Sequence, residues 1–284
     1  MYVSMKEMLK KANENNYAVM AINCFNLETV RAVIAAAEFE KAPIIVNIVE
    51  DHLLRHCDSG LIAPVVKMLG ERANIEVALN FDHGTEYGHL TEAIINGFSS
   101  VMVDASRYDL GGNIALTKRV VTFAKQYNAS VEGEIGCIGA NADGSSTQYT
   151  MYSDPKEAKI FADETEVDAL AISFGSSHGN YPDGIIPKFD FQRLKAIKDL
   201  TKMPLVLHGG SGSGEENILK AVEFGINKIN VGCDFLNACT KSTKDQLKEN
   251  PDINYFELIH KVEEDSIEKV RYYIRLSGSK DQSI

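Results

Sequence analysis

The sequence lacks the features that mark a membrane or secreted protein. No apolar run in its 284 residues approaches the roughly 18 residues that a membrane-spanning helix needs. Residues 1–17 have the pattern of an amphipathic helix and lack the apolar core of a signal peptide. The five cysteines are scattered, odd in number and without CxxC spacing, which argues against a disulfide framework or a thiolate metal site. We therefore expect a cytoplasmic protein without membrane partners.

Positive charge is also scarce. The chain carries 29 lysines and arginines against 40 acidic residues, which gives a net charge of −11 at pH 7. This balance argues against nucleic acids and anionic membranes as partners. It leaves anionic substrates open, because a local site can override the overall field.

What the chain does contain is a repeat of short apolar runs, each followed by a helical pattern. Eight runs have strand length, and most are rich in β-branched residues. This alternation implies parallel pairing, because parallel strands need crossover connections. The runs cover residues 17–24, 43–50, 75–82, 100–106, 130–136, 169–175, 204–210 and 228–234.

Two α/β folds fit this repeat, a closed (β/α)8 TIM barrel and an open doubly wound sheet. We favour the barrel because eight units follow one another without a linker and no glycine fingerprint follows the first run. The sequence thus predicts a single barrel domain over residues 1–284.

Polar residues gather at the C-terminal ends of the runs. A barrel brings these ends to one face, where enzymes of this fold place their active sites. Chance would scatter such residues, so the pattern predicts a site at that face. The residues are Asn23, Asp82, His83, Asp104, Glu134, His178, His208 and Asn230.

Three of the seven histidines, His83, His178 and His208, follow the third, sixth and seventh runs. Three imidazoles with an open fourth position form a common catalytic zinc site, so we predict a divalent metal, zinc, at this place. Asp104 and Glu134 have several open interpretations. They orient metal ligands, hold a second or mobile metal, or only make hydrogen bonds. The other histidines are interpreted as surface or packing residues: His52, His56, His89 and His260.

A glycine-rich segment, residues 209–214, follows the seventh run and precedes a predicted helix from Glu215. Glycines let backbone N–H groups face an anion, and a helix N-terminus adds positive potential. The loops after strands 7 and 8 are the usual phosphate site of this fold. We expect phosphate binding here, although a tight turn would give the same pattern.

Seven segments together resemble the class II, zinc-dependent ketose-bisphosphate aldolases over nearly the whole chain. This family includes the fructose- and tagatose-bisphosphate aldolases, and the sequence is most similar to the tagatose branch. The resemblance implies reversible cleavage of a ketose phosphate into dihydroxyacetone phosphate and an aldehyde. The segments are FDHG (81–84), SVMVDAS (100–106), NIALTKRVV (113–121), VEGEIG (131–136), FGSSHG (174–179), LVLHGGSG (205–212) and KINVGCD (228–234).

The resemblance also assigns roles to residues. Asp82 would protonate the aldehyde carbonyl, the three histidines would bind zinc, and a sodium or potassium ion would lie near the phosphate. Lys228 opens the eighth run, so we expect it at the opposite face and not as a Schiff-base lysine. Neighbours in a strand point to opposite sides, so Asp82 and His83 must sit where the strand gives way to loop. The substrate contacts implied are Asn23, Gly179, Gly209, Gly210, Ser211, Asn230, Val231, Gly232 and Cys233.

The sequence departs from the family at three places. A loop glutamate that moves the proton at the triose carbon falls on Ala142, with Asp143 beside it. Cys233 replaces a phosphate-site threonine, and a thiol is a weak hydrogen-bond donor. Val49 replaces a substrate-facing serine. These differences favour another sugar phosphate as substrate, or a slow enzyme.

Other functions fit some of the same residues. An epimerase could use the same metal site. A degenerate aldolase could serve as a sugar-phosphate sensor or assembly protein, which Ala142 and Cys233 favour and the intact Asp82 and histidines oppose. Residues 255–279 predict an amphipathic helix with a polar tail. The resemblance implies a homodimer or homotetramer formed through this region, and the alternative is a last outer helix of the barrel.

Overall fold

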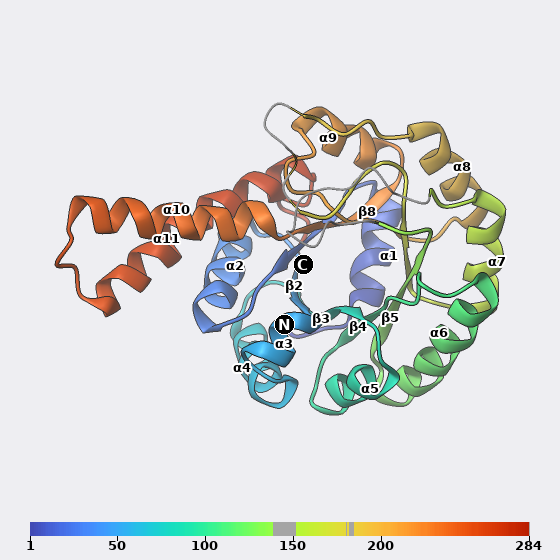
Figure 1. The fold of residues 1–284 in the computed structure, drawn as a ribbon, viewed down its shortest axis with the longest axis horizontal. Helices are drawn as coiled ribbons and strands as arrows, with labels where there is room; N and C mark the ends of the chain where they lie inside the picture. Colours follow the sequence, from blue (N-terminus) through green and yellow to red (C-terminus); the bar gives the residue numbers. More distant parts are fainter. Residues whose placement is uncertain (139–151, 180, 182–184, 284) are drawn as a thin grey trace.

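The structure, a computed structural model, describes residues 1–138, 152–179, 181 and 185–283. Eight parallel strands form a closed barrel in sequence order, with helices around it (Figure 1). Because the first strand pairs with the eighth, the predicted TIM barrel is confirmed and the open sheet is excluded. The strands are β1 (Val19–Asn23), β2 (Ile44–Val49), β3 (Val77–Gly84), β4 (Ser100–Val103), β5 (Ser130–Ile135), β6 (Ala169–Ile172), β7 (Leu205–Leu207) and β8 (Ile226–Val231).

The helices follow the predicted alternation with the strands. Helix α7 shows a predicted start, because the Asp154 side chain accepts hydrogen bonds from the backbone N–H groups of Lys156 and Glu157, and Pro155 occupies the first turn. The described helices are α1 (Met5–Asn15), α2 (Leu27–Glu40), α3 (Glu50–Arg55), α4 (Ser59–Arg72), α5 (Tyr87–Ile95), α6 (Leu110–Ala124), α7 (Pro155–Thr165), α8 (Phe191–Thr201), α9 (Glu215–Glu223), α10 (Cys233–Glu249) and α11 (Tyr255–Leu276), with a short 3₁₀ turn at Lys125–Tyr127.

Helix α1 packs against the N-terminal end of the barrel. Its apolar face, including Met8 and Leu9, joins a buried cluster with inward side chains of several strands. The backbone N–H of Met5 donates to the Oγ atoms of Ser100 and Ser130, each at 3.1 Å. These serines open β4 and β5, so α1 covers the end of the barrel opposite the predicted site.

Helices α10 and α11 form a hairpin that projects away from the barrel (Figure 1). The predicted amphipathic helix after residue 255 is confirmed as α11, and it packs along α2. The alternative for this segment, a last outer helix of the barrel, holds for the part of α11 that packs along α2. It is wrong for the rest, because the tip of the hairpin extends beyond the barrel. Helix α10, which begins at Cys233, was not predicted.

All five cysteines lie in the described part of the chain and are free thiols. Among the described helices, none combines the length and the apolar character that crossing a membrane requires.

Candidate active site

The predicted polar residues meet at the carboxyl-terminal end of the barrel. A cavity of about 270 Å³ opens there. Asp104, Glu134 and His208 lie beside it, because each has an atom within 4.0 Å of the lining residue His83. The predicted convergence of strand ends is therefore confirmed. The lining residues are Asn23, Val49, Asp82, His83, His178, Gly179, Gly209, Ser211, Asn230, Gly232 and Cys233.

The three predicted histidines form one compact group. One ring nitrogen from each of His83, His178 and His208 lies within 4.8 Å of the others. His83 Nε2 is 3.0 Å from His208 Nδ1. His178 Nε2 is buried and has no hydrogen-bond partner among the described residues. A buried, unpaired ring nitrogen is unfavourable, and a metal ion coordinated by the three imidazoles would satisfy it. These residues therefore fit a zinc ion.

The backbone of β3 explains how adjacent Asp82 and His83 both reach this cavity. His83 has φ of +54°, in the left-handed region that non-glycine residues rarely adopt. The pairing of β3 with β4 shifts register between Phe81 and Gly84. This irregularity breaks the alternation of a regular strand. The expected departure from strand geometry is present, although it lies within the last residues of β3 and not in a loop.

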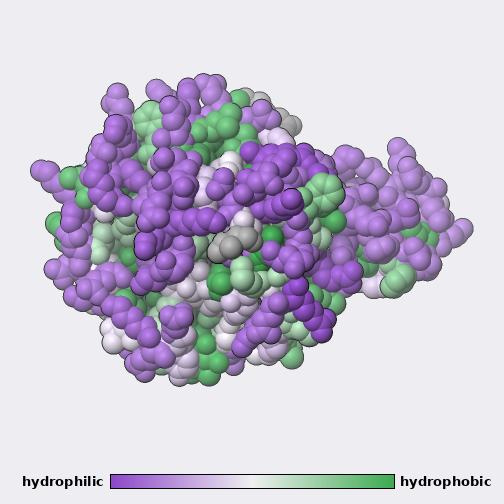
Figure 2. Space-filling view, turned by 180° about the vertical axis from the view of Figure 1, so that it is seen from behind, coloured by the Kyte–Doolittle hydropathy of each residue, from purple (hydrophilic) through white to green (hydrophobic). Residues whose placement is uncertain are grey.

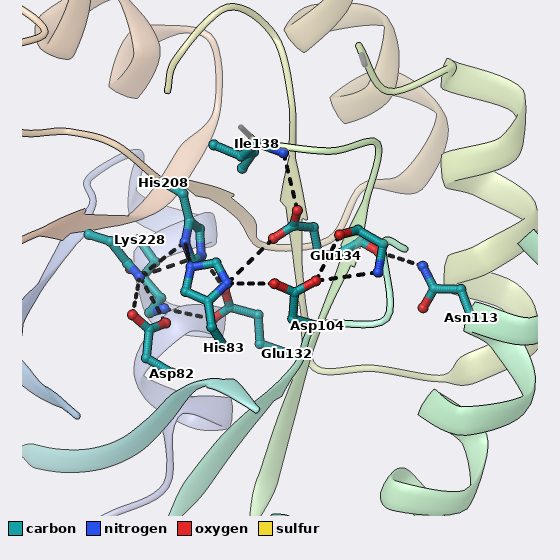
Figure 3. Close-up of polar contacts among 11 residues, drawn as sticks. Asp82, His83, Asp104, Asn113, Glu132, Glu134, Ile138, His208 and Lys228 are labelled. Atoms are coloured by element: carbon teal, nitrogen blue, oxygen red, sulfur yellow. Dashed lines mark hydrogen bonds and ion pairs between the residues drawn. The ribbon is translucent and has the colours of Figure 1, made fainter. Parts of the chain in front are cut away.

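Asp104 and Glu134 approach His83 from the other side of its ring (Figure 3). His83 Nδ1 donates to Asp104 Oδ2 at 2.9 Å, and Glu134 Oε2 lies 4.0 Å from the same nitrogen. These three residues form a second group that could hold a metal. A neutral imidazole has one free lone pair, so His83 can ligate a metal in only one group at a time. When the three-histidine group is filled, Asp104 orients His83.

The charges around His83 favour a cation in the site. Burial opposes protonation of His83, but the carboxylates of Asp82, Asp104 and Glu134 outweigh it and raise its pKa to about 10. Burial and the nearby Asp104 carboxylate raise the pKa of Glu134 to about 8. Burial and the charge on His83 lower the pKa values of His178 and His208. The site thus stabilises one positive charge, which a proton or a metal ion can supply.

Asp82 is buried next to the three histidines. Asn230 Nδ2 donates to Asp82 Oδ1 at 3.1 Å and to Oδ2 at 3.3 Å. Val49 pairs with Asp82 in the barrel register and also lines the cavity. The Asn230 amide therefore positions this carboxylate beside the cavity, which Val49 also lines.

The loops after β6, β7 and β8 also border the cavity. Gly209 has φ of +68°, and a Cβ at this residue would lie 2.2 Å from the carbonyl oxygen of Ser177. Only glycine allows this close approach of two loops. Gly232 caps α10 and Cys233 is its first residue, so the positive end of that helix faces the cavity. Helix α9 begins at Glu215, as predicted.

Two residues expected to contact substrate do not line the cavity. A Cβ at Gly210 would lie 2.7 Å from the Ile229 side chain and 2.8 Å from the Asn230 carbonyl oxygen, so Gly210 is required for packing. The Val231 side chain is buried in the hydrophobic core. Ala142, which stands where the family has a loop glutamate, and its neighbour Asp143 lie outside the described residues.

Lys228 is not at the opposite face of the barrel, so that expectation is wrong. Its side chain is fully buried inside the barrel, where Nζ lies 2.7 Å from Glu132 Oε2. Glu132 also contacts His208, and sequence reasoning missed it. Opposite charges within two fully buried strands, β5 and β8, were the available indication of this contact.

The remaining four histidines lie outside the three-histidine group, as predicted. His89 Nδ1 lies 2.9 Å from Glu50 Oε1, and His260 Nε2 lies 3.4 Å from Glu264 Oε1. His52 and His56 pack edge-on against the Phe25 ring.

Comparisons with known proteins all lead to aldolases. Residues 3–282 match the family model described as fructose-bisphosphate aldolase class-II. Fructose-bisphosphate aldolases of Geobacillus stearothermophilus and Staphylococcus aureus are each 40% identical over 253 residues, 88% of both chains. The crystal structure of the YdjI aldolase from Escherichia coli K12 has a TM-score of 0.89 and 29% identity over 100% of both chains. A structure titled as a putative fructose-1,6-biphosphate aldolase from Coccidioides immitis has a TM-score of 0.87 and 26% identity, covering 97% of this chain and 96% of that one.

Proposed function

This chain belongs to the class II fructose-bisphosphate aldolase family, and we propose that it cleaves a ketose phosphate reversibly, with zinc, into dihydroxyacetone phosphate and an aldehyde. The enzyme class, a carbon–carbon lyase, follows from the family. The observation that most supports a zinc-dependent mechanism is that the three-histidine group lies beside Asp82 at one cavity.

The residues divide the chemistry between them. His83, His178 and His208 would hold zinc, and the chemistry that zinc supplies in such a site is Lewis-acid stabilisation of negative charge on a substrate oxygen. Asp82 would donate a proton to the aldehyde oxygen during condensation and take it back during cleavage. The Asn230 amide holds the Asp82 carboxylate in place. No lysine is needed for a Schiff base, and Lys228 is already paired with Glu132.

Phosphate binding would rest on backbone N–H groups. The described lining of the cavity contains no lysine or arginine. Its capacity for an anion comes from the glycine loop at Gly209, the hydroxyl of Ser211 and the start of α10 at Cys233. We therefore propose that this end holds the phosphate of the triose half.

Four finer points remain proposals. The named relatives suggest fructose 1,6-bisphosphate as substrate, and the sequence resemblance adds tagatose 1,6-bisphosphate. Val49 and Cys233 instead favour another sugar phosphate. His83 is shared by both metal groups, which favours one zinc ion over two. A sodium or potassium ion near the phosphate and a cytoplasmic location stay predictions from the sequence.

A panel of ketose 1-phosphates and 1,6-bisphosphates tests the proposal. Dihydroxyacetone phosphate release is measured with a coupled dehydrogenase, before and after treatment with a zinc chelator. We expect release from at least one ketose phosphate, loss of release with the chelator and recovery with zinc. Chelator-resistant cleavage would contradict the mechanism. Tight binding of zinc and triose phosphate without turnover on any ketose would support the sensor function.

A further inference from the structure

A buried ion pair lies beside His208, a member of the three-histidine group (Figure 3). Glu132 on β5 and Lys228 on β8 have fully buried side chains, and Glu132 Oε2 lies 2.7 Å from Lys228 Nζ. The other carboxylate oxygen, Oε1, lies 2.9 Å from His208 Nε2. Burying two charges is costly unless each finds partners, so this arrangement calls for an explanation beyond packing.

The contact with Glu132 determines which nitrogen of His208 is free to bind a metal. A carboxylate only accepts hydrogen bonds, so His208 Nε2 must donate. A neutral imidazole then has its lone pair on Nδ1. That Nδ1 atom is the one that lies 3.0 Å from His83 Nε2, on the side of the three-histidine group.

We propose that Glu132 is a positioning residue for zinc binding. It holds His208 with the lone pair of Nδ1 directed at the metal position. This inference rests on the proposed zinc site, but not on any particular substrate. Asp104 does the same for His83 through Nδ1, so two of the three imidazoles have a carboxylate on the nitrogen away from the group.

Lys228 fixes the orientation of Glu132. The lysine ammonium has three donors and no acceptor, so it holds Oε2 and leaves Oε1 to face His208. A glutamine at residue 132 would keep the shape of the side chain, but it would replace one of the two acceptor oxygens with an NH₂ donor. Its oxygen would turn to Lys228, and its NH₂ group would face His208 Nε2, which favours the wrong tautomer.

The test is the zinc affinity of the apo-protein, measured by competition with a chromogenic chelator. Glu132→Gln and Glu132→Ala should each weaken zinc binding by about 10- to 100-fold. Lys228→Met should also weaken zinc binding. The matched control is Glu40→Gln, because Glu40 is also a buried carboxylate with cationic partners but lies at the α2–α11 contact. It should leave zinc affinity unchanged. Wild-type affinity in folded Glu132→Gln and Glu132→Ala would overturn the proposal.

A measurement on the wild-type protein keeps the proposal falsifiable if these variants do not fold. Histidine ¹⁵N spectra of the zinc-loaded protein should show His208 protonated at Nε2 and coordinated through Nδ1. Coordination through Nε2, or a wild-type chain that binds no zinc, would overturn the proposal. The proposed function can fail separately: tight zinc binding that depends on Glu132, in a protein that cleaves no ketose phosphate, leaves the positioning role intact.

Discussion

Asp82 and His83 are neighbours in the chain, yet the proposed mechanism needs both at one cavity. The left-handed backbone of His83 meets this need, at a conformational cost of about 1–3 kcal/mol. Such strain persists only where the surroundings hold it. Here the hydrogen bonds from His83 to Asp104 and from Asn230 to Asp82 provide that support.

Replacing Asp82 by asparagine tests its role as the proton carrier. Asp82→Asn keeps the shape of the side chain but cannot transfer a proton to the aldehyde oxygen. We expect kcat to fall by about 10²- to 10⁴-fold, the usual contribution of general acid–base catalysis. Because Asp82 is in neither metal group, zinc content should not change. Steady-state rates and metal analysis check both expectations, and a near wild-type rate would remove Asp82 from the mechanism.

The sequence predicts residues at strand ends better than residues within strands. His83, His178 and His208 stand where polar side chains have no structural reason to gather. Glu132 and Lys228 lie inside strands, and their pairing depends on the closure of the barrel, which brings β5 and β8 to face each other across its interior. No local pattern specifies that contact.

At the scale of elements, the loop after β7 depends on the close approach of Gly209 to Ser177. Gly209→Ala must displace one of the two loops, since the added Cβ would overlap the Ser177 carbonyl oxygen. We expect weaker binding of dihydroxyacetone phosphate by about 1–2 kcal/mol, roughly tenfold, as one or two hydrogen bonds are lost. Gly88→Ala is the control, because no atom lies within 4 Å of a Cβ there. Equal triose phosphate affinity in both variants would exclude this loop from phosphate binding.

Helix α11 is joined to α2 through Glu40, which accepts hydrogen bonds from Arg271 and Arg275. Burial alone would raise the pKa of Glu40, but the two arginines outweigh it and lower the pKa below its usual 4.5. The ion pairs therefore stabilise the fold at pH values above 4.5, and this stability is lost as the pH falls through the lowered pKa. Solvent screening weakens the ion pair between Arg275 and Glu40, because the Arg275 side chain is well exposed.

Urea unfolding of Glu40→Gln checks this account. At pH 7 the variant should be less stable than wild type by about 1–2 kcal/mol. The difference should shrink as the pH falls from 4.5 through the lowered pKa, because Glu40 takes up a proton first in the unfolded chain and then in the folded protein. A difference that stays constant or grows on acidification would show that the arginines do not act through the Glu40 charge.

Most elements could be predicted because strand runs and helix patterns alternate along the chain. Of the hairpin, only its second helix, α11, could be predicted. Helix α10 begins at Cys233, inside the predicted eighth run (228–234), so the run hid the start of the helix. Figure 2 shows the hairpin as largely hydrophilic with scattered apolar side chains.

At the scale of the whole molecule, we propose that the hairpin contributes to a homodimer or homotetramer. Tyr255 and Phe256 at the start of α11 are 77% and 75% exposed, which is unusual for large aromatic residues. Phe256→Glu should shift the protein toward smaller species in sedimentation velocity. Leu61→Glu is the control, since Leu61 is also exposed but lies on α4. An identical oligomeric state in wild type and Phe256→Glu would place the interface elsewhere.

The most direct test of zinc-dependent cleavage is a zinc titration of the metal-free protein, in which aldol cleavage activity is measured at each zinc concentration. Because His83 can ligate a metal in one group at a time, we expect activity to rise linearly and to stop at one zinc per chain. His178→Ala should abolish both tight zinc binding and activity. Full activity without added metal, or a plateau at two zinc ions per chain, would contradict this expectation.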